Sequence, residues 1–161
     1  MEIEVFLVFI IIGYICLVVF SIYRRFKIEN DIKENIENLA NNSLEMTPEE
    51  FLEMRNKSFG GRGRPRISQK YNFEGVYIIL NQSKNMYYIG QGKEVLNRIN
   101  SHFTGKGNGD VYADYKYGDT FIIKMISLEG SGYSSLNDLE RHTIFTYNSY
   151  NNGYNKTRGN R

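Results

Sequence analysis

The sequence predicts an α+β fold: a small three-stranded antiparallel sheet flanked by helices, preceded by one N-terminal transmembrane helix. Two observations support this. Residues 5–23 carry no charged side chain. Residues 71–161 alternate between short β-branched and aromatic runs and longer runs of helical period, in the order β-β-α-β-α. The chain therefore divides into a transmembrane anchor (1–23), a charged linker (24–70) and a folded domain (71–161).

The uncharged stretch 5–23 is long enough to cross a bilayer. A helix of that length rises about 28 Å, close to the hydrocarbon thickness of a membrane. A cleaved signal peptide would begin with basic residues and have a shorter apolar core, whereas this stretch follows Glu2 and Glu4. Because Arg24 and Arg25 come directly after it, we expect the N-terminus outside and the C-terminal domain in the cytoplasm. The lipid bilayer is thus the expected partner of residues 5–23.

The first part of the linker is strongly acidic, with eight acidic side chains and one lysine between residues 29 and 53. Apolar residues recur there at helical spacing, which predicts a short amphipathic helix with an apolar stripe of Ile28, Ile32, Ile36 and Leu39. Such a stripe leaves open self-association into a homo-oligomer or recruitment of an unidentified protein partner. The run Thr47-Pro48-Glu49-Glu50 predicts the start of a second helix, with Thr as its cap.

The second part of the linker is basic, with six basic and no acidic side chains in residues 55–70. Its segment 60–66 reads Gly-Gly-Arg-Gly-Arg-Pro-Arg, which resembles an AT-hook. An extended strip of this kind fits the minor groove of A·T-rich DNA, with Arg62, Arg64 and Arg66 as the contacting residues. The alternative is a flexible basic linker that contacts phosphates or lipid headgroups without sequence preference. Both interpretations bring the neighbouring domain to a polyanion.

The domain itself is predicted from its local patterns. β-branched and aromatic runs predict strands over 73–81, 86–91 and 119–128, with a turn between the first two. Helical spacing of apolar residues predicts helices over 93–103 and 134–150. Three glycines predict a loop over 104–110. The single cysteine, Cys16, excludes a disulfide within the chain.

Several polar residues stand at distinctive positions among these elements. Gly75-Val76-Tyr77 is followed by Tyr88-Ile89-Gly90, and Arg98 and His102 share one face of the next helix because they are four residues apart. Glu140 lies on the later helix and Asn155 near the end of the chain. In its order and spacing this set resembles the GIY-YIG nuclease family over residues 73–159. Val76 replaces the central Ile of the first motif, a conservative change in a strand.

The resemblance implies a divalent-metal-dependent endonuclease that hydrolyses DNA. It implies Glu140 as the ligand of Mg²⁺ or Mn²⁺, and such ions need only one or two carboxylates. It further implies Tyr77 at the attacking water with Tyr88 beside it, Arg98 on the scissile phosphate, His102 as a proton acceptor or relay, and Asn155 as a neutral hydrogen-bonding group that orients the site. The matching positions implied as catalytic are Tyr77, Tyr88, Arg98, His102, Glu140 and Asn155.

Two other functions remain open at this stage. A non-enzymatic, membrane-tethered DNA-binding module could keep the same fold, and DNA binding without cleavage under any metal would distinguish it. A third hypothesis is a small membrane protein whose acidic linker recruits a protein partner. The abundance of Asn, Ile, Lys and Tyr indicates an A·T-rich genome and hence a bacterial or phage source.

Overall fold

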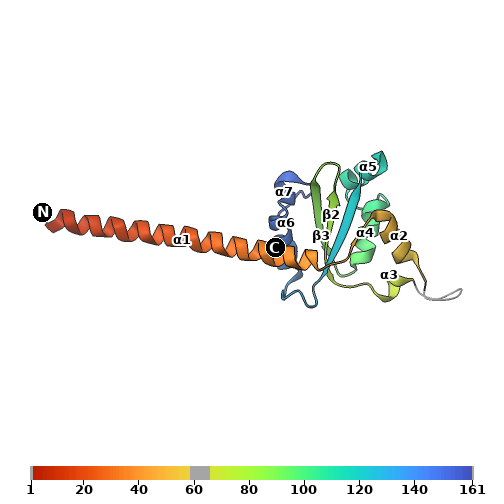
Figure 1. The fold of residues 1–161 in the computed structure, drawn as a ribbon, viewed down its shortest axis with the longest axis horizontal. Coiled ribbons are helices and arrows are strands. Elements are labelled where there is room, and N and C mark those ends of the chain that lie inside the picture. Colours follow the sequence, from red (N-terminus) through yellow and green to blue (C-terminus); the bar gives the residue numbers. More distant parts are fainter. Residues whose placement is uncertain (1, 59–65, 161) are drawn as a thin grey trace.

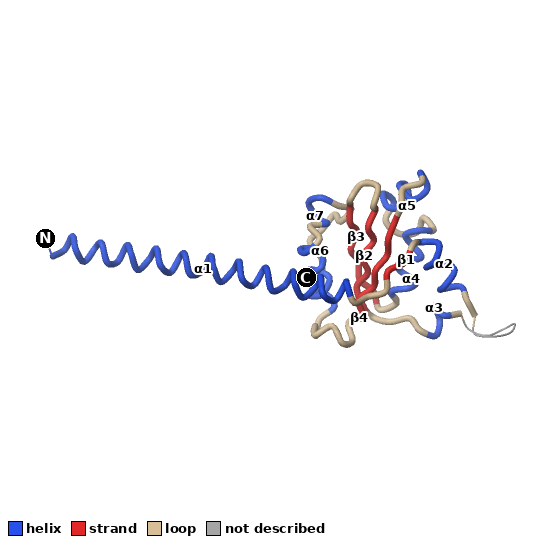
Figure 2. The backbone as a smooth tube through the Cα atoms, viewed as in Figure 1, coloured by secondary structure: helices blue, strands red, loops and turns tan. Residues whose placement is uncertain are grey.

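The structure is a computed structural model that describes residues 2–58 and 66–160. It confirms the α+β class, with helices on both sides of one sheet (Figures 1 and 2). The strands are β1 (Glu45–Met46), β2 (Gly75–Asn81), β3 (Met86–Gly92) and β4 (Phe121–Ser127). The helices are α1 (Glu2–Asn41), α2 (Pro48–Asn56), α3 (Ile67–Lys70), α4 (Val95–Phe103), α5 (Gly109–Tyr117), α6 (Leu136–Thr146) and α7 (Ser149–Asn152).

The sheet has four strands in the order β1-β4-β2-β3, so the prediction of three strands was wrong by one. The additional strand, β1, has two residues, which pair with Lys124 and Ile123 of β4. A strand this short has no sequence period, and only the long-range pairing creates it. The three long strands lie where the sequence predicts them, all antiparallel, with β3 at an edge.

Each face of the sheet is covered by its own helices. One core contains Tyr77 and Ile79 of β2 and packs against α2, α4 and α5. The other contains Val76 and Ile78 and packs against α6 and the C-terminal part of α1. Successive residues of a strand point to opposite faces, which is why neighbours in β2 enter different cores. The two groups of helices lie on opposite sides of the sheet in Figure 1.

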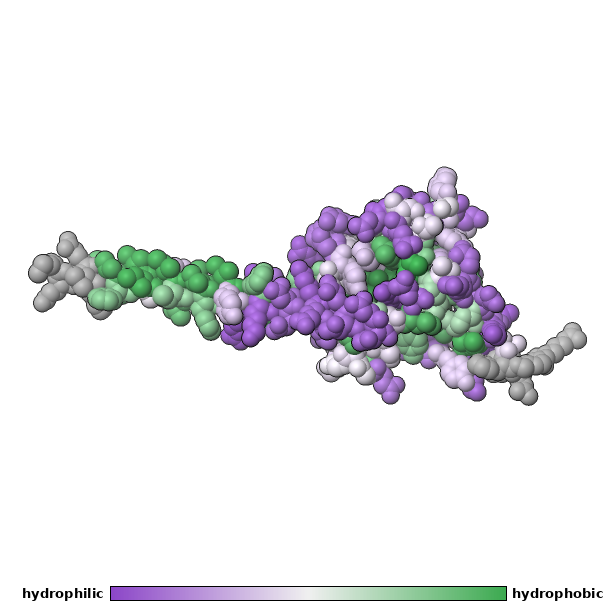
Figure 3. Space-filling model, viewed as in Figure 1, coloured by the Kyte–Doolittle hydropathy of each residue, from purple (hydrophilic) through white to green (hydrophobic). Residues whose placement is uncertain are grey.

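Helix α1 is continuous from Glu2 to Asn41 and projects from the domain (Figure 1). The apolar stretch and the predicted amphipathic helix are therefore one helix, since no glycine or proline interrupts residues 14–47. Side chains 7–28 are exposed, and this helix is long and apolar enough to cross a membrane. Figure 3 shows the apolar surface giving way to a hydrophilic one as α1 approaches the domain.

Part of the predicted linker lies inside the folded unit. Ile36 and Ala40 of α1 are fully buried, as is Phe51 of α2. The predicted helix start at Thr47 has the expected capping box: the Thr47 hydroxyl accepts from the Glu50 amide, and the Glu50 carboxylate accepts from the Thr47 amide. The segment 36–56 thus packs with the domain, although the sequence predicts a domain that begins only at residue 71.

The AT-hook-like segment lies largely outside the described residues, because these resume at residue 66. Arg62 and Arg64 belong to the part that is not described. Arg66 is exposed, directly precedes α3, and forms an isolated antiparallel bridge with Ser58.

Candidate active site

The hairpin of β2 and β3 places the two tyrosine–glycine motifs side by side. Tyr77 pairs directly with Gly90, and Ile79 pairs with Tyr88. A Cβ atom on Gly90 would lie 2.2 Å from the Tyr77 hydroxyl oxygen, so the Tyr77 ring crosses the space above this glycine. The Tyr77 and Tyr88 ring centroids are 6.2 Å apart. Glycine is thus required at position 90 because the buried phenol occupies the place of a side chain.

His102 fixes the orientation of the Tyr77 hydroxyl. Its Nδ1 atom accepts a hydrogen bond from the Asn108 backbone amide at 2.8 Å. A backbone N–H only donates, so Nδ1 is unprotonated and the ring proton is on Nε2. Nε2 lies 2.9 Å from the Tyr77 hydroxyl oxygen and therefore donates to it. Burial, together with the charge of Arg98, lowers the pKa of His102 to about 4, so that the ring is neutral at pH 7.

The Tyr77 and Tyr88 rings lie side by side, and each phenol affects the pKa of the other. Because the Tyr77 oxygen accepts from His102, its own proton is directed away from the histidine. Burial raises the pKa of Tyr77 far above its usual range, and the nearby Tyr88 raises it further, while Arg98 lowers it. Burial also raises the pKa of Tyr88, and Arg98 opposes this shift. Both phenols are therefore protonated at neutral pH.

Arg98 provides the positive charge of this cluster. It is exposed on α4, and its charge acts on the pKa of Tyr77, Tyr88 and His102. A Cβ atom on Gly92 would lie 2.8 Å from the Arg98 Cγ atom, so this glycine at the end of β3 makes room for the arginine stem. The exposed arginine can thus meet an anion from solvent while its stem packs at the sheet edge.

Glu140 approaches from the other side of the sheet, on α6. It is only 7% exposed, and burial raises the pKa of its carboxyl group. Its Oε2 atom accepts from the Gln91 side-chain amide at 3.0 Å and from the Asn160 backbone amide at 3.2 Å. Its charge raises the pKa of Tyr88, which puts the carboxylate within electrostatic range of the hairpin. Because β3 is an edge strand, groups from both faces meet around its free side.

Sequence reasoning missed Gln91. Its side-chain amide donates to Glu140 and to the Asn137 side-chain oxygen, at 3.0 and 2.9 Å. Alternation along β3 puts Gln91 on the same face as the buried Ile89 and opposite to Tyr88. Gln91 could have been recognised from the sequence, because it is a polar residue at an inward position directly after Tyr88-Ile89-Gly90. Gln91 holds one carboxylate oxygen of Glu140, and the other oxygen takes no hydrogen bond from the described residues.

Asn155 acts on the backbone of β3. Its side-chain oxygen accepts from the Ile89 amide and its side-chain nitrogen donates to the Ile89 carbonyl, each at 2.8 Å. These two bonds substitute for a neighbouring strand on the free edge of β3, between Tyr88 and Gly90. Asn155 therefore positions the hairpin and does not point its amide at a reacting group.

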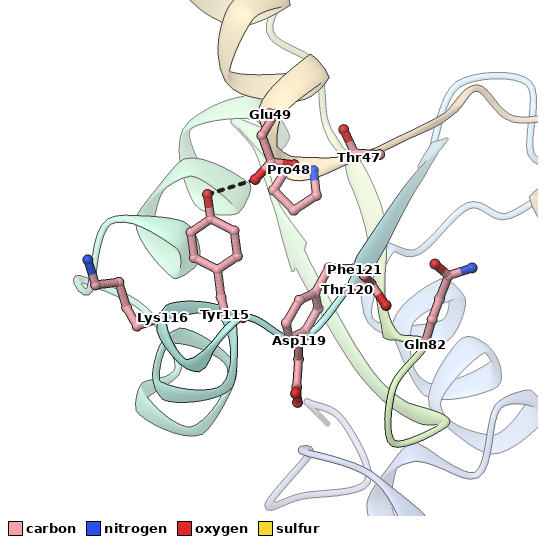
Figure 4. A pocket seen from close by; sticks show the side chains of 10 residues that line it. Thr47, Pro48, Glu49, Gln82, Tyr115, Lys116, Asp119, Thr120 and Phe121 are labelled. Atoms are coloured by element: carbon pink, nitrogen blue, oxygen red, sulfur yellow. Dashed lines mark hydrogen bonds between the residues drawn. The ribbon is translucent and has the colours of Figure 1, made fainter.

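The remaining histidine and the surface tyrosines lie apart from this cluster. His142 is hydrogen-bonded through Nδ1 to the Tyr133 hydroxyl, at 3.0 Å. Tyr115 packs edge-on against Phe103 and Phe121. It also donates to Glu49 at the rim of a pocket of about 510 Å³ between α2, α5 and β4 (Figure 4). That pocket contains none of the predicted site residues.

The donor set suits a hard, largely hydrated cation. Among the described residues no three His, Cys, Asp or Glu side chains converge as ligands, which does not fit a tetrahedral zinc site. Glu140 offers a single buried carboxylate with one oxygen available. Mg²⁺ and Mn²⁺ are bound in this way, through one or two carboxylates with several waters retained.

The buried neutral His102 makes the stability of the protein dependent on pH. Its pKa is about 4 in the folded chain and about 6.5 when unfolded, so the unfolded chain binds the proton more tightly. This contribution is fully present above pH 6.5 and is lost as the pH falls toward 4. Between pH 7 and 5 we expect a loss of about 2 kcal/mol in the free energy of unfolding.

Urea denaturation of the wild-type chain and of His102→Asn at pH 7 and pH 5 measures this effect. The variant loses the His102 contribution and should show a smaller drop, with the remaining drop coming from other groups such as His142, whose pKa is also lowered by burial. Equal drops in the two proteins would contradict the assignment of a neutral His102.

Comparison with known proteins agrees with this arrangement. Residues 73–155 match the GIY-YIG catalytic domain, a region that spans from just before β2 to Asn155 and contains every residue of the cluster. No curated protein and no solved structure matches the chain. Nucleases of this kind generally depend on a divalent metal. Since the match covers more than half of its residues, the chain belongs to the GIY-YIG family, whose members are generally nucleases acting on DNA.

Proposed function

We propose that the chain is a membrane-anchored endonuclease that uses Mg²⁺ or Mn²⁺ to hydrolyse phosphodiester bonds of DNA. The observation that carries this proposal is the hydrogen-bonded series from Asn108 through His102 to Tyr77, with Tyr88 packed beside it, near the charge of Arg98 and within the field of Glu140. Structural packing alone does not need a buried, oriented phenol next to an exposed arginine and a buried carboxylate.

The chain's own residues supply binding and orientation. Arg98 donates two hydrogen bonds to the scissile phosphate and stabilises the charge that develops there. The Tyr77 and Tyr88 hydroxyls hold the attacking water in line with phosphorus. The water oxygen bonds to phosphorus, the bond to the sugar oxygen breaks, and one proton of the water ends on the departing sugar hydroxyl. A divalent ion on Glu140, when bound, supplies charge neutralisation at the phosphate and the leaving oxygen.

The raised pKa of Tyr77 bears on its role. A phenol that is protonated at neutral pH does not take a proton from water, so we assign to Tyr77 the positioning of the water. His102 carries its proton on the nitrogen that faces Tyr77, so it orients this hydroxyl and is not the proton acceptor. The hydrogen-bonded pair thus acts as a rigid support for the reacting water.

The proposed location follows from α1. Its apolar stretch is exposed along 7–23, and Arg24, Arg25 and Lys27 follow it, which favours an N-terminus outside and a cytoplasmic nuclease domain. The acidic part of α1 lies beside this domain. Arg62, Arg64 and Arg66 are proposed to contact DNA, in the minor groove or along the phosphates, and so raise its local concentration at the site. A bacterial or phage source fits the composition.

The test uses the full chain. Membranes from expressing cells, washed at alkaline pH, should retain the protein, and its detergent extract should cut plasmid DNA with Mg²⁺ or Mn²⁺ but not with EDTA. Arg98→Ala should lower the rate by a factor of about 10²–10³, as for loss of one transition-state donor. DNA binding without cleavage under either metal would favour a non-enzymatic binding module, and release by the alkaline wash would contradict the anchor.

A further inference from the structure

A second group of basic side chains lines a pocket on the α6 side of the sheet. This pocket, of about 490 Å³, lies between α1, α6, α7 and the C-terminal segment. Lys33, Arg141 and Arg158 line it, from three stretches that are far apart in sequence. None of its lining residues within the described part of the chain is acidic. Its charge therefore favours an anionic ligand.

Two of these cations are held in place by aromatic rings. The Lys33 Nζ atom lies 5.4 Å from the centroid of Phe145, and the Arg158 Cζ atom lies 5.2 Å from that of Tyr150. Cation–π contacts of this kind restrict long side chains that would otherwise be mobile. Arg141 forms an ion pair with Asp138, whereas no ion pair of Lys33 or Arg158 is seen among the described residues. These two residues thus carry the unbalanced charge of the pocket.

The pocket and the candidate active site share helix α6. Glu140 and Arg141 are consecutive on this helix, about 100° apart around its axis. Glu140 reaches Gln91 of β3, and Arg141 lines the pocket. A DNA strand carries a phosphate at every nucleotide, so a strand bound at Glu140 has further phosphates close by. A site for a small anion such as sulfate would not need the exposed aromatic rings beside it. Phe145 is 40% exposed and Tyr150 is 39% exposed.

We propose that this pocket binds a backbone phosphate of the DNA strand, next to the scissile one. The inference rests on the proposed function. Lys33 and Arg158 both lie outside the matched region 73–155, so this contact is an addition of this chain to the catalytic domain. It also gives α1 a part in DNA binding, through Lys33, beyond holding the domain.

The test measures DNA affinity as a function of salt. The full chain is placed in nanodiscs of zwitterionic lipid, and binding of a fluorescent duplex is measured in EDTA, so that no cleavage occurs. Lys33→Gln/Arg158→Gln should weaken binding about tenfold at low salt and reduce the slope of log affinity against log salt by about 0.9, because the pocket binds one phosphate and each phosphate contact contributes about 0.9. The charge-conserving Lys33→Arg/Arg158→Lys should keep most of the wild-type slope.

A matched control removes the same charge elsewhere. Lys84 and Lys116 are exposed in the β2–β3 turn and on α5, outside both the pocket and the basic linker, so Lys84→Gln/Lys116→Gln should leave the slope within about 0.3 of the wild-type value. Equal slopes for the wild type and the Lys33/Arg158 variant, or equal losses in the two double variants, would overturn the proposal. The proposal would also be overturned if the Lys33/Arg158 variant differed from the wild type only in its binding to nanodiscs of anionic lipid. The pocket would then bind lipid headgroups.

The outcome is separable from that of the proposed function. A wild type that cuts DNA but shows no slope change in the variant refutes the pocket alone. A wild type that binds DNA with the expected slope change but never cleaves it refutes the nuclease and keeps the phosphate site.

Discussion

Glu140→Gln is expected to lower the rate of DNA cleavage by about 10³-fold while leaving the fold intact. The substitution keeps the volume of a side chain that is only 7% exposed, and its amide oxygen can still accept from Gln91. It removes the only charge of the proposed ligand, and a metal ion contributes several kcal/mol to the stabilisation of the transition state. Plasmid cleavage under single-turnover conditions measures the loss.

Glu129→Gln is the matched control, since Glu129 is an exposed carboxylate in the loop after β4. It should retain the wild-type rate. An unchanged rate in Glu140→Gln would refute the metal site.

Gln91→Ala tests the same assignment through the residue that orients Glu140. Loss of this group should weaken Mn²⁺ binding by 10- to 100-fold, as measured by calorimetry. High metal concentration should restore its activity, and Gln82→Ala, an exposed glutamine without this contact, should bind Mn²⁺ normally.

Gly90→Ala should disable the protein although it adds one methyl group. The new Cβ atom would lie 2.2 Å from the Tyr77 hydroxyl oxygen and 2.4 Å from its Cζ atom. The Tyr77 ring is fully buried and bonded to His102, so it cannot swing aside without breaking the cluster. We expect a loss of about 3 kcal/mol in the free energy of unfolding and at least a 10²-fold lower cleavage rate.

Gly109→Ala is the control for this prediction. A Cβ atom at Gly109 meets nothing within 4 Å, and the residue begins α5, where alanine is favourable. Urea denaturation and plasmid cleavage should distinguish the two variants clearly. Similar midpoints and rates in both would show that the Tyr77 ring does not depend on the space above Gly90.

The hairpin was predictable because its two strands and their turn are encoded locally. The observed β2 and β3 differ from the predicted strands by no more than two residues at either end. Helix α5 was not predicted, although Asn108 caps its start and Gly118 ends it in the left-handed region. Two glycines precede it and a third is its first residue, and Val111 is its only buried residue, so its apolar period is too sparse to be recognised.

The chemistry of the site was only partly readable. The resemblance to the GIY-YIG family indicates Tyr77, Arg98 and Glu140, whereas each of these residues taken alone is typical of strand packing or of a helix surface. The tautomer of His102 depends on an amide six residues away, and the grip of Asn155 on Ile89 depends on strand β3 being at an edge. Such roles arise from tertiary contacts, which no local pattern contains.

The unbroken helix α1 has a mechanical consequence. Residues 24–41 rise about 27 Å, and their buried end packs against α6 and the sheet. With residues 5–23 in a bilayer, this continuous helical segment would set a fixed distance between the lipid surface and the candidate active site. The domain would then be held at a constant distance from the membrane and would reach only nucleic acid that passes at that distance.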